Sequence, residues 1–362
     1  MITYWLIFVL ITCLAIMAQP RQVPRLDNTY PTNIDSGWVF IIFFLTIFIG
    51  LRYQVGGDWF IYEEHLIESI GASMLSTISK FGDPGYYFFN WISGNLGLNV
   101  YGVNLVCALI FSIGLFFFCR SQPRPLLALA VAIPYLIIVV GMGYTRQAAA
   151  IGLAMVGISM FIKGRLGLFI FWVFVAAAFH KSAVFLIPMG IASIGKSSFL
   201  RIFSIFLIAL ISFYLYLDQY IEKLYENYIT AQSQSSGAFI RLSMNAVPAL
   251  IYLIFRQRFN LSKNEKSLYF WFSFISIILL ILFFILNSST ALDRIALYMI
   301  PLQLAVFSRL PDILGGSLQG RSITFLFVIV FYSLVMFVWL NFASHSYLWV
   351  PYKFFPAEYI SS

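Results

Sequence analysis

Long apolar runs, separated by short polar breaks, recur along the whole chain. A helix needs about 20 apolar residues to cross the hydrocarbon core of a bilayer, so the pattern predicts about twelve membrane-spanning helices. The runs lie near residues 2–19, 37–51, 98–119, 126–142, 147–162, 166–179, 182–195, 202–217, 242–255, 268–287, 293–308 and 322–341. We therefore expect an all-α, polytopic integral membrane protein in which residues 1–362 form a single membrane domain.

The composition agrees with this pattern, because 61% of the residues are hydrophobic and 10% are charged. Soluble domains carry about 25% charged residues. The first run has no basic residues in front of it and no small-residue cleavage site after it, so we expect it to remain in the protein as a helix. Cys13, Cys107 and Cys119 fall inside apolar runs and have neither disulfide nor metal-ligand spacing.

The lysines and arginines of the short loops predict how the chain is oriented in the membrane. Most of the 22 basic residues fall in loops that we place in the cytoplasm, at 20–36, 120–125, 163–165, 196–201, 256–267 and 309–321. Both chain ends then face outward, together with two larger loops at 52–97 and 218–241. The net charge of +8 thus reflects topology, and we expect no nucleic-acid partner.

A few basic residues remain on the outward side, at the mouths of predicted helices. They are Arg52, Arg146, Lys181, Arg241 and Arg294. A cation at this depth is costly unless it is paired, extends to the interface or binds a substrate. For any one of them, a structural role as an anchor or in an ion pair explains the residue as well as a functional role does. Five cations on separate helices fit a lipid-linked phosphate or pyrophosphate, because guanidinium groups bind phosphate oxygens in pairs. The anionic substrate path of a transporter needs the same charges.

The two larger outward loops contain further candidates. Asp58, Tyr62 and His65 are spaced by four and three residues, which places them along one face if the segment is helical. Asp83 precedes a Pro-Gly turn signature and then aromatic residues suited to the membrane interface. The second loop is rich in tyrosine, asparagine, glutamine and serine, which suit contacts with sugars, although tyrosines are common at the interface of any membrane protein.

The apolar segment at 166–195 is too long for one helix, which would measure about 45 Å, and too short for two full spans. We infer two short or tilted helices that turn at His180, Lys181 and Ser182. A lone histidine is most often structural. An ionisable group at membrane depth is nevertheless a functional candidate, and His180 has a cation beside it.

In chain order, these residues form a pattern that resembles a known family. The pattern consists of Arg52, Gly57, Asp58 and Tyr62, then Asp83, Pro84, Gly85 and Tyr86, then Arg146 and Gln147, then His180, Lys181, Ser182 and Ala183 with Pro188, and then Arg294 with Tyr298. It covers nearly the whole chain and resembles the EpsG family of Wzy-type polysaccharide (O-antigen) polymerases. The resemblance implies a glycosyltransferase at the outer face of the bacterial inner membrane. Such an enzyme joins repeat units carried on undecaprenyl pyrophosphate into O-antigen or exopolysaccharide.

The resemblance also implies site residues and partners. The residues expected near the acceptor sugar are Tyr62, Asp83, Tyr86, Gln147 and Tyr298. The expected partners are the lipid bilayer and the undecaprenyl-pyrophosphate-linked oligosaccharide, with a flippase and a chain-length regulator as candidates.

A glycan on a polyprenyl pyrophosphate already carries a good leaving group. The enzyme therefore has to hold the pyrophosphate and deprotonate an acceptor hydroxyl. We expect Arg52, Arg146 and Arg294, helped by Lys181 and Arg241, to bind the pyrophosphate and stabilise its growing charge.

The base that deprotonates the acceptor is expected to be Asp58 or His180. Asp58 is preferred, because a carboxylate beside arginines remains ionised. The sequence contains no convincing cage for a divalent metal, and the basic cluster can replace one. We therefore expect a metal-independent reaction without a cofactor.

Three other functions remain open at this point. A lipid-linked glycan flippase or another secondary transporter has a similar number of helices and also uses cations at membrane depth. An O-antigen ligase uses the same donor but transfers the glycan to lipid A-core. A glycosyltransferase that uses polyprenyl-phosphate sugars typically has paired acidic residues in its first outer loop. The adjacent Glu63 and Glu64 in this loop are compatible with that function.

Overall fold

The structure is a computed structural model that describes residues 1–18, 34–80, 82–194, 203, 207, 210, 237–286 and 289–361. Within these residues the regular structure is helical, and the β-structure is an isolated bridge between Arg52 and Phe354. The all-α prediction is confirmed. The predicted span at 202–217 and the larger loop at 218–241 fall almost entirely outside the described residues.

Six helices of the described part are long and apolar enough to cross a membrane. They are α6 (Asn99–Arg120), α8 (Thr145–Ile162), α12 (Ala238–Phe255), α13 (Lys263–Ile285), α16 (Leu318–Phe342) and the helix Ala291–Leu314, which combines α14 (Thr290–Ala296), η3 (Leu297–Met299) and α15 (Ile300–Leu314). Each of them coincides with a predicted apolar run. The total of about twelve spans stays a prediction.

Shorter apolar helices coincide with further predicted runs. They are α1 (Ile2–Met17), α2 (Ser36–Gly50), α7 (Pro125–Ala132) continued by the π-helix η1 (Ile133–Gly141), α9 (Leu166–Ala177), and the short 3-10 helix η2 (Lys181–Phe185) continued by α10 (Leu186–Ile194). The predicted break in the segment at 166–195 is present, because α9 ends at Ala177 and η2 begins at Lys181.

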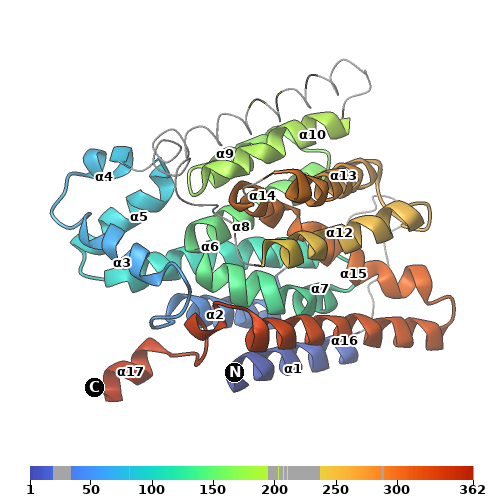
Figure 1. Ribbon diagram of the computed structural model, residues 1–362, viewed down its shortest axis with the longest axis horizontal. Coiled ribbons are helices and arrows are strands. Elements are labelled where there is room, and N and C mark those ends of the chain that lie inside the picture. Colours follow the sequence, from blue (N-terminus) through green and yellow to red (C-terminus); the bar gives the residue numbers. More distant parts are fainter. Residues whose placement is uncertain are drawn as a thin grey trace.

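Short polar-flanked helices gather at one end of the bundle, which is on the left in Figure 1. They are α3 (Trp59–Ile67), α4 (Met74–Lys80), α5 (Pro84–Asn95), η4 (Ser346–Leu348) and α17 (Phe355–Ser361). The start of α1 lies at the same end, where the Tyr4 hydroxyl donates a 2.7 Å hydrogen bond to the Trp349 carbonyl. We call this end the α3–α5 end.

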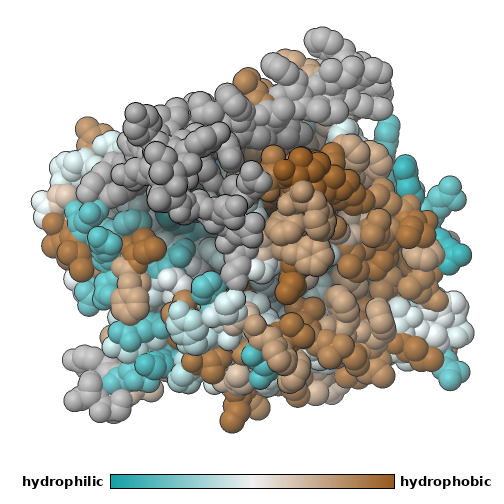
Figure 2. Space-filling model, in the orientation of Figure 1, coloured by the Kyte–Doolittle hydropathy of each residue, from teal (hydrophilic) through white to brown (hydrophobic). Residues whose placement is uncertain are grey.

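Ion pairs join the helices at the opposite end. Arg120 lies 3.4 Å from Asp35, Arg309 lies 3.0 Å from Glu265, and Arg124 pairs with Asp312. These residues come from loops and helix ends that the charge pattern placed together on one side. Figure 2 shows hydrophilic residues at both ends of the molecule and a hydrophobic surface between them, as expected for a membrane protein.

Helices α6 and α8 approach each other closely because a glycine of each faces its partner. A side chain at Gly114 would collide with the backbone of Gly152, and a Cβ atom at Gly152 would lie 2.6 Å from the Phe111 Cα atom. Small residues are the usual means by which membrane helices come this close. The contact fixes the start of α8, which carries Arg146, within the bundle.

Candidate functional site

The loop between α2 and α3 is built around Arg52, whose side chain is fully buried. Its guanidinium donates to the carbonyls of Ile49 (2.7 Å) and Val55 (3.0 Å) and to the side chains of Thr145 (2.7 Å) and Asn104 (3.5 Å). A guanidinium that is enclosed and bonded in this way has no surface to offer a substrate. We therefore leave Arg52 out of the pyrophosphate-binding set and assign it a structural role.

Replacing Arg52 by lysine should destabilise the protein, because an ammonium group cannot make the same divergent bonds from one buried position. We expect a loss of about 2–4 kcal/mol, measured as a lower melting temperature in detergent and a lower amount of protein in membranes. The protein that does fold should keep its turnover. Normal stability with lost turnover would instead mean that Arg52 acts on the substrate.

The same loop is held by the C-terminal segment. Tyr53 N–H donates to the Lys353 carbonyl (3.0 Å), Gly56 N–H to Leu348 (2.9 Å), and Phe355 N–H to Leu51 (2.9 Å). Gly56 has a φ of 108°, and a Cβ atom there would collide with the Met142 carbonyl, so glycine is required. This turn places Asp58 directly before α3.

Asp58 and Tyr62 lie one helical turn apart, and the Tyr62 hydroxyl donates to the Asp58 carboxylate at 3.4 Å. Burial raises the pKa of Asp58 above its ordinary value, against the opposing charges of Arg146 and Arg294. Tyr62 packs on Tyr86 of α5, and His65, the third residue of the predicted face, packs on the next residue of α5, with its Nδ1 atom 3.3 Å from the Tyr87 hydroxyl. Asp58 is therefore a partly solvated carboxyl close to two arginines.

Arg146 lies in the first turn of α8, and its Nη1 atom is 2.9 Å from Asp83 Oδ2. Its guanidinium covers the rings of Tyr62 and Tyr86, at 5.9 and 5.6 Å from their centroids. The Nε atom is buried and has no hydrogen-bond partner among the described residues. Arg146 is thus held on three sides while it remains half-buried at the α3–α5 end.

Asp83 connects this arginine to the turn after α9. Its Oδ1 atom accepts a hydrogen bond from the Lys181 N–H at 3.3 Å, and Gly85 N–H donates to the Ala178 carbonyl at 2.7 Å. Burial raises the pKa of Asp83, although Arg146 opposes this shift. Because Asp83 is buried and bonded on both oxygens, it positions Arg146 and the turn.

His180 lies in that turn, with its Nδ1 atom 2.6 Å from the Ser182 hydroxyl. Ser182 in turn donates to the Tyr298 hydroxyl at 3.4 Å. Gln147 donates to the backbone carbonyl of Arg294 at 2.6 Å and so ties α8 to α14. These bonds bring α8, α14 and the His180 turn together around one point.

A second ion pair between an arginine and an aspartate lies beside this point. Arg241, in the first turn of α12, binds both carboxylate oxygens of Asp293, at 2.6 and 2.9 Å. Tyr144, just before α8, lies within electrostatic range of this pair and also of Asp58 and Arg294. The charged residues of α3, α8, α12 and α14 therefore form one continuous cluster at the α3–α5 end.

The model of the EpsG family matches residues 37–354, a range that contains every candidate residue and most of the chain. The chain belongs to the EpsG family. The match confirms the resemblance read from the sequence and, with the apolar helices, makes this a membrane protein of the polysaccharide-polymerase type. Comparison with curated proteins and with solved structures gives no significant match.

In this EpsG-family protein, the predicted site residues divide by exposure. Those that are half-buried are Asp58, Arg146, His180, Lys181, Arg241 and Arg294. Those that are buried beneath them are Tyr62, Asp83, Tyr86, Gln147 and Tyr298. The structure does not place this second set where a sugar can contact it, and we therefore treat its members as positioning residues.

Asp293, Tyr144 and Asn245 also belong to this cluster, and we did not predict them from the sequence. Asp293 lies directly before Arg294 at the mouth of a predicted helix. An arginine of another helix at the same depth needs an acidic partner, and this position was the signal for Asp293. Asn245 donates to the Ala296 carbonyl at 2.7 Å and steadies the segment that carries Arg294. Contacts of this kind join distant helices and have no local sequence pattern.

The cluster is cationic and contains few metal ligands. Within the described residues, no three His, Cys, Asp or Glu side chains lie close enough to hold a metal ion. The expectation of a metal-independent reaction stays a prediction.

Proposed function

We propose that this protein is a polysaccharide polymerase that joins oligosaccharide repeat units carried on undecaprenyl pyrophosphate, at the outer face of the bacterial inner membrane. The observation that carries this proposal is the half-buried Asp58 carboxyl within electrostatic range of Arg146 and Arg294. A base beside fixed cations is what transfer from a pyrophosphate leaving group requires. Membership in the EpsG family supports the same class of activity.

In the proposed reaction, Asp58 accepts the proton of an acceptor hydroxyl as its oxygen bonds to the anomeric carbon of the donor. The bond between that carbon and the pyrophosphate breaks, and the leaving pyrophosphate keeps the electron pair. Arg146 and Arg294, with Lys181 and Arg241 nearby, stabilise the negative charge that develops on it. The cations are fixed beforehand by Asp83, Gln147 and Asp293, so they need little reorganisation during the reaction.

His180 is the second candidate for the base. Its Nδ1 atom is engaged by Ser182, which orients the ring. Asp58 remains preferred, because Arg146 and Arg294 favour an ionised carboxylate, whereas the same two cations disfavour a protonated imidazole at His180.

The decisive experiment is deletion of the gene in its native host, followed by gel analysis of the surface glycan. A polymerase is expected to leave single repeat units on the surface, whereas loss of a flippase leaves none. Purified protein should then extend lipid-linked repeat units in vitro. Transfer to lipid A-core without extension would show a ligase, and failure to form any glycosidic bond would contradict the proposal.

The pH dependence of turnover should show the raised pKa of Asp58. A base acts only when ionised, so activity should be present above the pKa of Asp58 in the protein and be lost as the pH falls through it. Replacing Arg294 by glutamine removes a cation that lowers this pKa, so the acidic limb should move to higher pH. Arg294→Lys keeps the charge and should leave the limb in place. An unchanged limb in Arg294→Gln would mean that another group titrates.

A further inference from the structure

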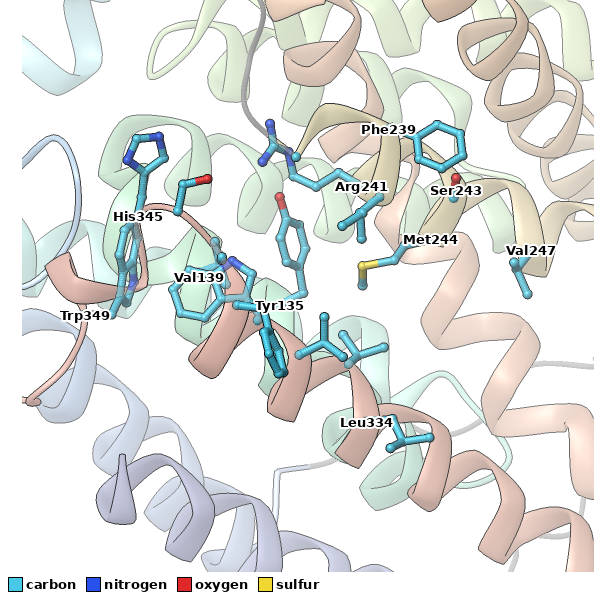
Figure 3. Close-up of a pocket in the computed structure, with 18 of the residues that line it drawn as sticks. Tyr135, Val139, Phe239, Arg241, Ser243, Met244, Val247, Leu334, His345 and Trp349 are labelled. Carbon is cyan, nitrogen blue, oxygen red and sulfur yellow. The ribbon is translucent and has the colours of Figure 1, made fainter.

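A largely apolar groove of about 600 Å³ lies between α12 and α16, above η1. Its walls include Val247 of α12 and Leu334 and Val338 of α16, which are among the exposed hydrophobic side chains of the hydrophobic surface. Figure 3 shows Arg241 and His345 at one end of the groove and Val247 and Leu334 toward the other. The groove is thus apolar along its length and polar at the α3–α5 end.

A buried hydroxyl at this polar end is unsatisfied. Tyr135 is 5% exposed, and its OH group has no hydrogen-bond partner among the described residues. Figure 3 shows this hydroxyl pointing toward Arg241, across the groove. A buried hydroxyl without a partner costs free energy, which a bound acceptor oxygen would recover. Tyr135 also lies in a π-helix, a rare geometry that is common at functional sites.

The groove leads to the proposed reaction centre. Tyr144 lines it two residues before Arg146, and Arg241 lines it and binds Asp293, the residue directly before Arg294. A molecule that fills the groove with an apolar chain and presents an anion at Arg241 would therefore place its next group toward Arg146 and Arg294.

We propose that the groove holds the first isoprene units of the lipid-linked donor, with the diphosphate between Arg241 and the Tyr135 hydroxyl. The inference rests on the proposed function and adds a location for the lipid part of its substrate. At about 30 Å³ for each water-sized group, the groove accommodates about 20 heavy atoms, which is enough for the diphosphate and about two isoprene units. The remainder of a longer chain stays in the bilayer, which it enters between the exposed side chains of α12 and α16.

The test compares two matched substitutions on α16. Val338 lines the groove and is 43% exposed, whereas Val330 is 49% exposed and does not line it. Val338→Trp should fill the groove and weaken binding of geranylgeranyl diphosphate to purified protein by about tenfold. Val330→Trp should bind like the unaltered protein, and melting temperatures in detergent show whether both variants fold. Equal binding by the two variants would overturn the proposal.

Tyr135→Phe tests the polar end of the groove. We expect about fivefold weaker binding of geranylgeranyl diphosphate and unchanged binding of geranylgeraniol, which has the same chain without phosphate. An equal effect on both probes would show that the hydroxyl does not contact the diphosphate. Phosphatidylglycerol that competes as well as the diphosphate would mean that the groove holds an ordinary bilayer lipid, and would also overturn the proposal.

The outcomes also separate this inference from the proposed function. If both variants lose diphosphate binding as expected while the unaltered protein extends no glycan, the groove assignment stands and the polymerase proposal fails. If the unaltered protein polymerises and both Val338→Trp and Tyr135→Phe polymerise equally well, the polymerase proposal stands and the groove assignment fails.

Discussion

Replacing Asp58 by asparagine should lower chain extension by about 10²–10⁴-fold while the protein remains folded and binds its lipid-linked substrate. The amide keeps the size of the carboxyl and its hydrogen bond with Tyr62, but it cannot accept a proton from the acceptor hydroxyl. Turnover should be measured with purified protein and lipid-linked repeat units, with donor binding measured in parallel.

The matched control is Glu63→Gln, which makes the same chemical change on an exposed residue of α3. It should keep full activity. Full turnover in Asp58→Asn would remove Asp58 as the base, and His180→Ala would then be the variant expected to lose activity.

Replacing Arg146 by alanine should lower turnover by about 10³-fold, because it removes a fixed cation from the leaving pyrophosphate. The same change leaves the Asp83 carboxyl buried without its ion-pair partner, so the protein should also become less stable. These two effects have to be separated by experiment.

The double variant Arg146→Ala with Asp83→Asn separates them. It removes both charges and keeps an acceptor for the Lys181 N–H, so it should restore most of the stability, whereas turnover should stay low because the cation is still absent. Arg165→Ala, which removes an exposed arginine just beyond the opposite end of α8, serves as a control and should change neither quantity. Restored turnover in the double variant would mean that Arg146 matters only for folding.

The sequence predicted the helices well, because the thickness of the hydrocarbon core sets the length of each apolar run. The break at His180 followed from the same length argument, and α9 and η2 meet there. The candidate charges at the helix mouths were found because ionisable residues are rare in this composition. Arg146 and Arg294 both act electrostatically on Asp58.

The depth of each side chain could not be predicted, because it depends on how the helices pack. Arg52 and Arg146 both follow or begin an apolar run, yet Arg52 is enclosed by Asn104 and Thr145 and Arg146 is half-buried. The groove likewise depends on the separation of α12 from α16. Pro134 in the run at 126–142, which lacks an N–H donor, was a local sign of the irregular helix η1.

The attachment of the Asp58 loop to residues 348–355 has a consequence for biosynthesis. Leu51, Tyr53 and Gly56 take their backbone partners from a part of the chain that leaves the ribosome after every spanning helix has been made. The earlier helices can insert into the membrane one after another while the loop that carries Asp58 still lacks these partners. A nascent chain should therefore gain activity only when its last segment docks, and a chain interrupted after α16 should be inserted but inactive.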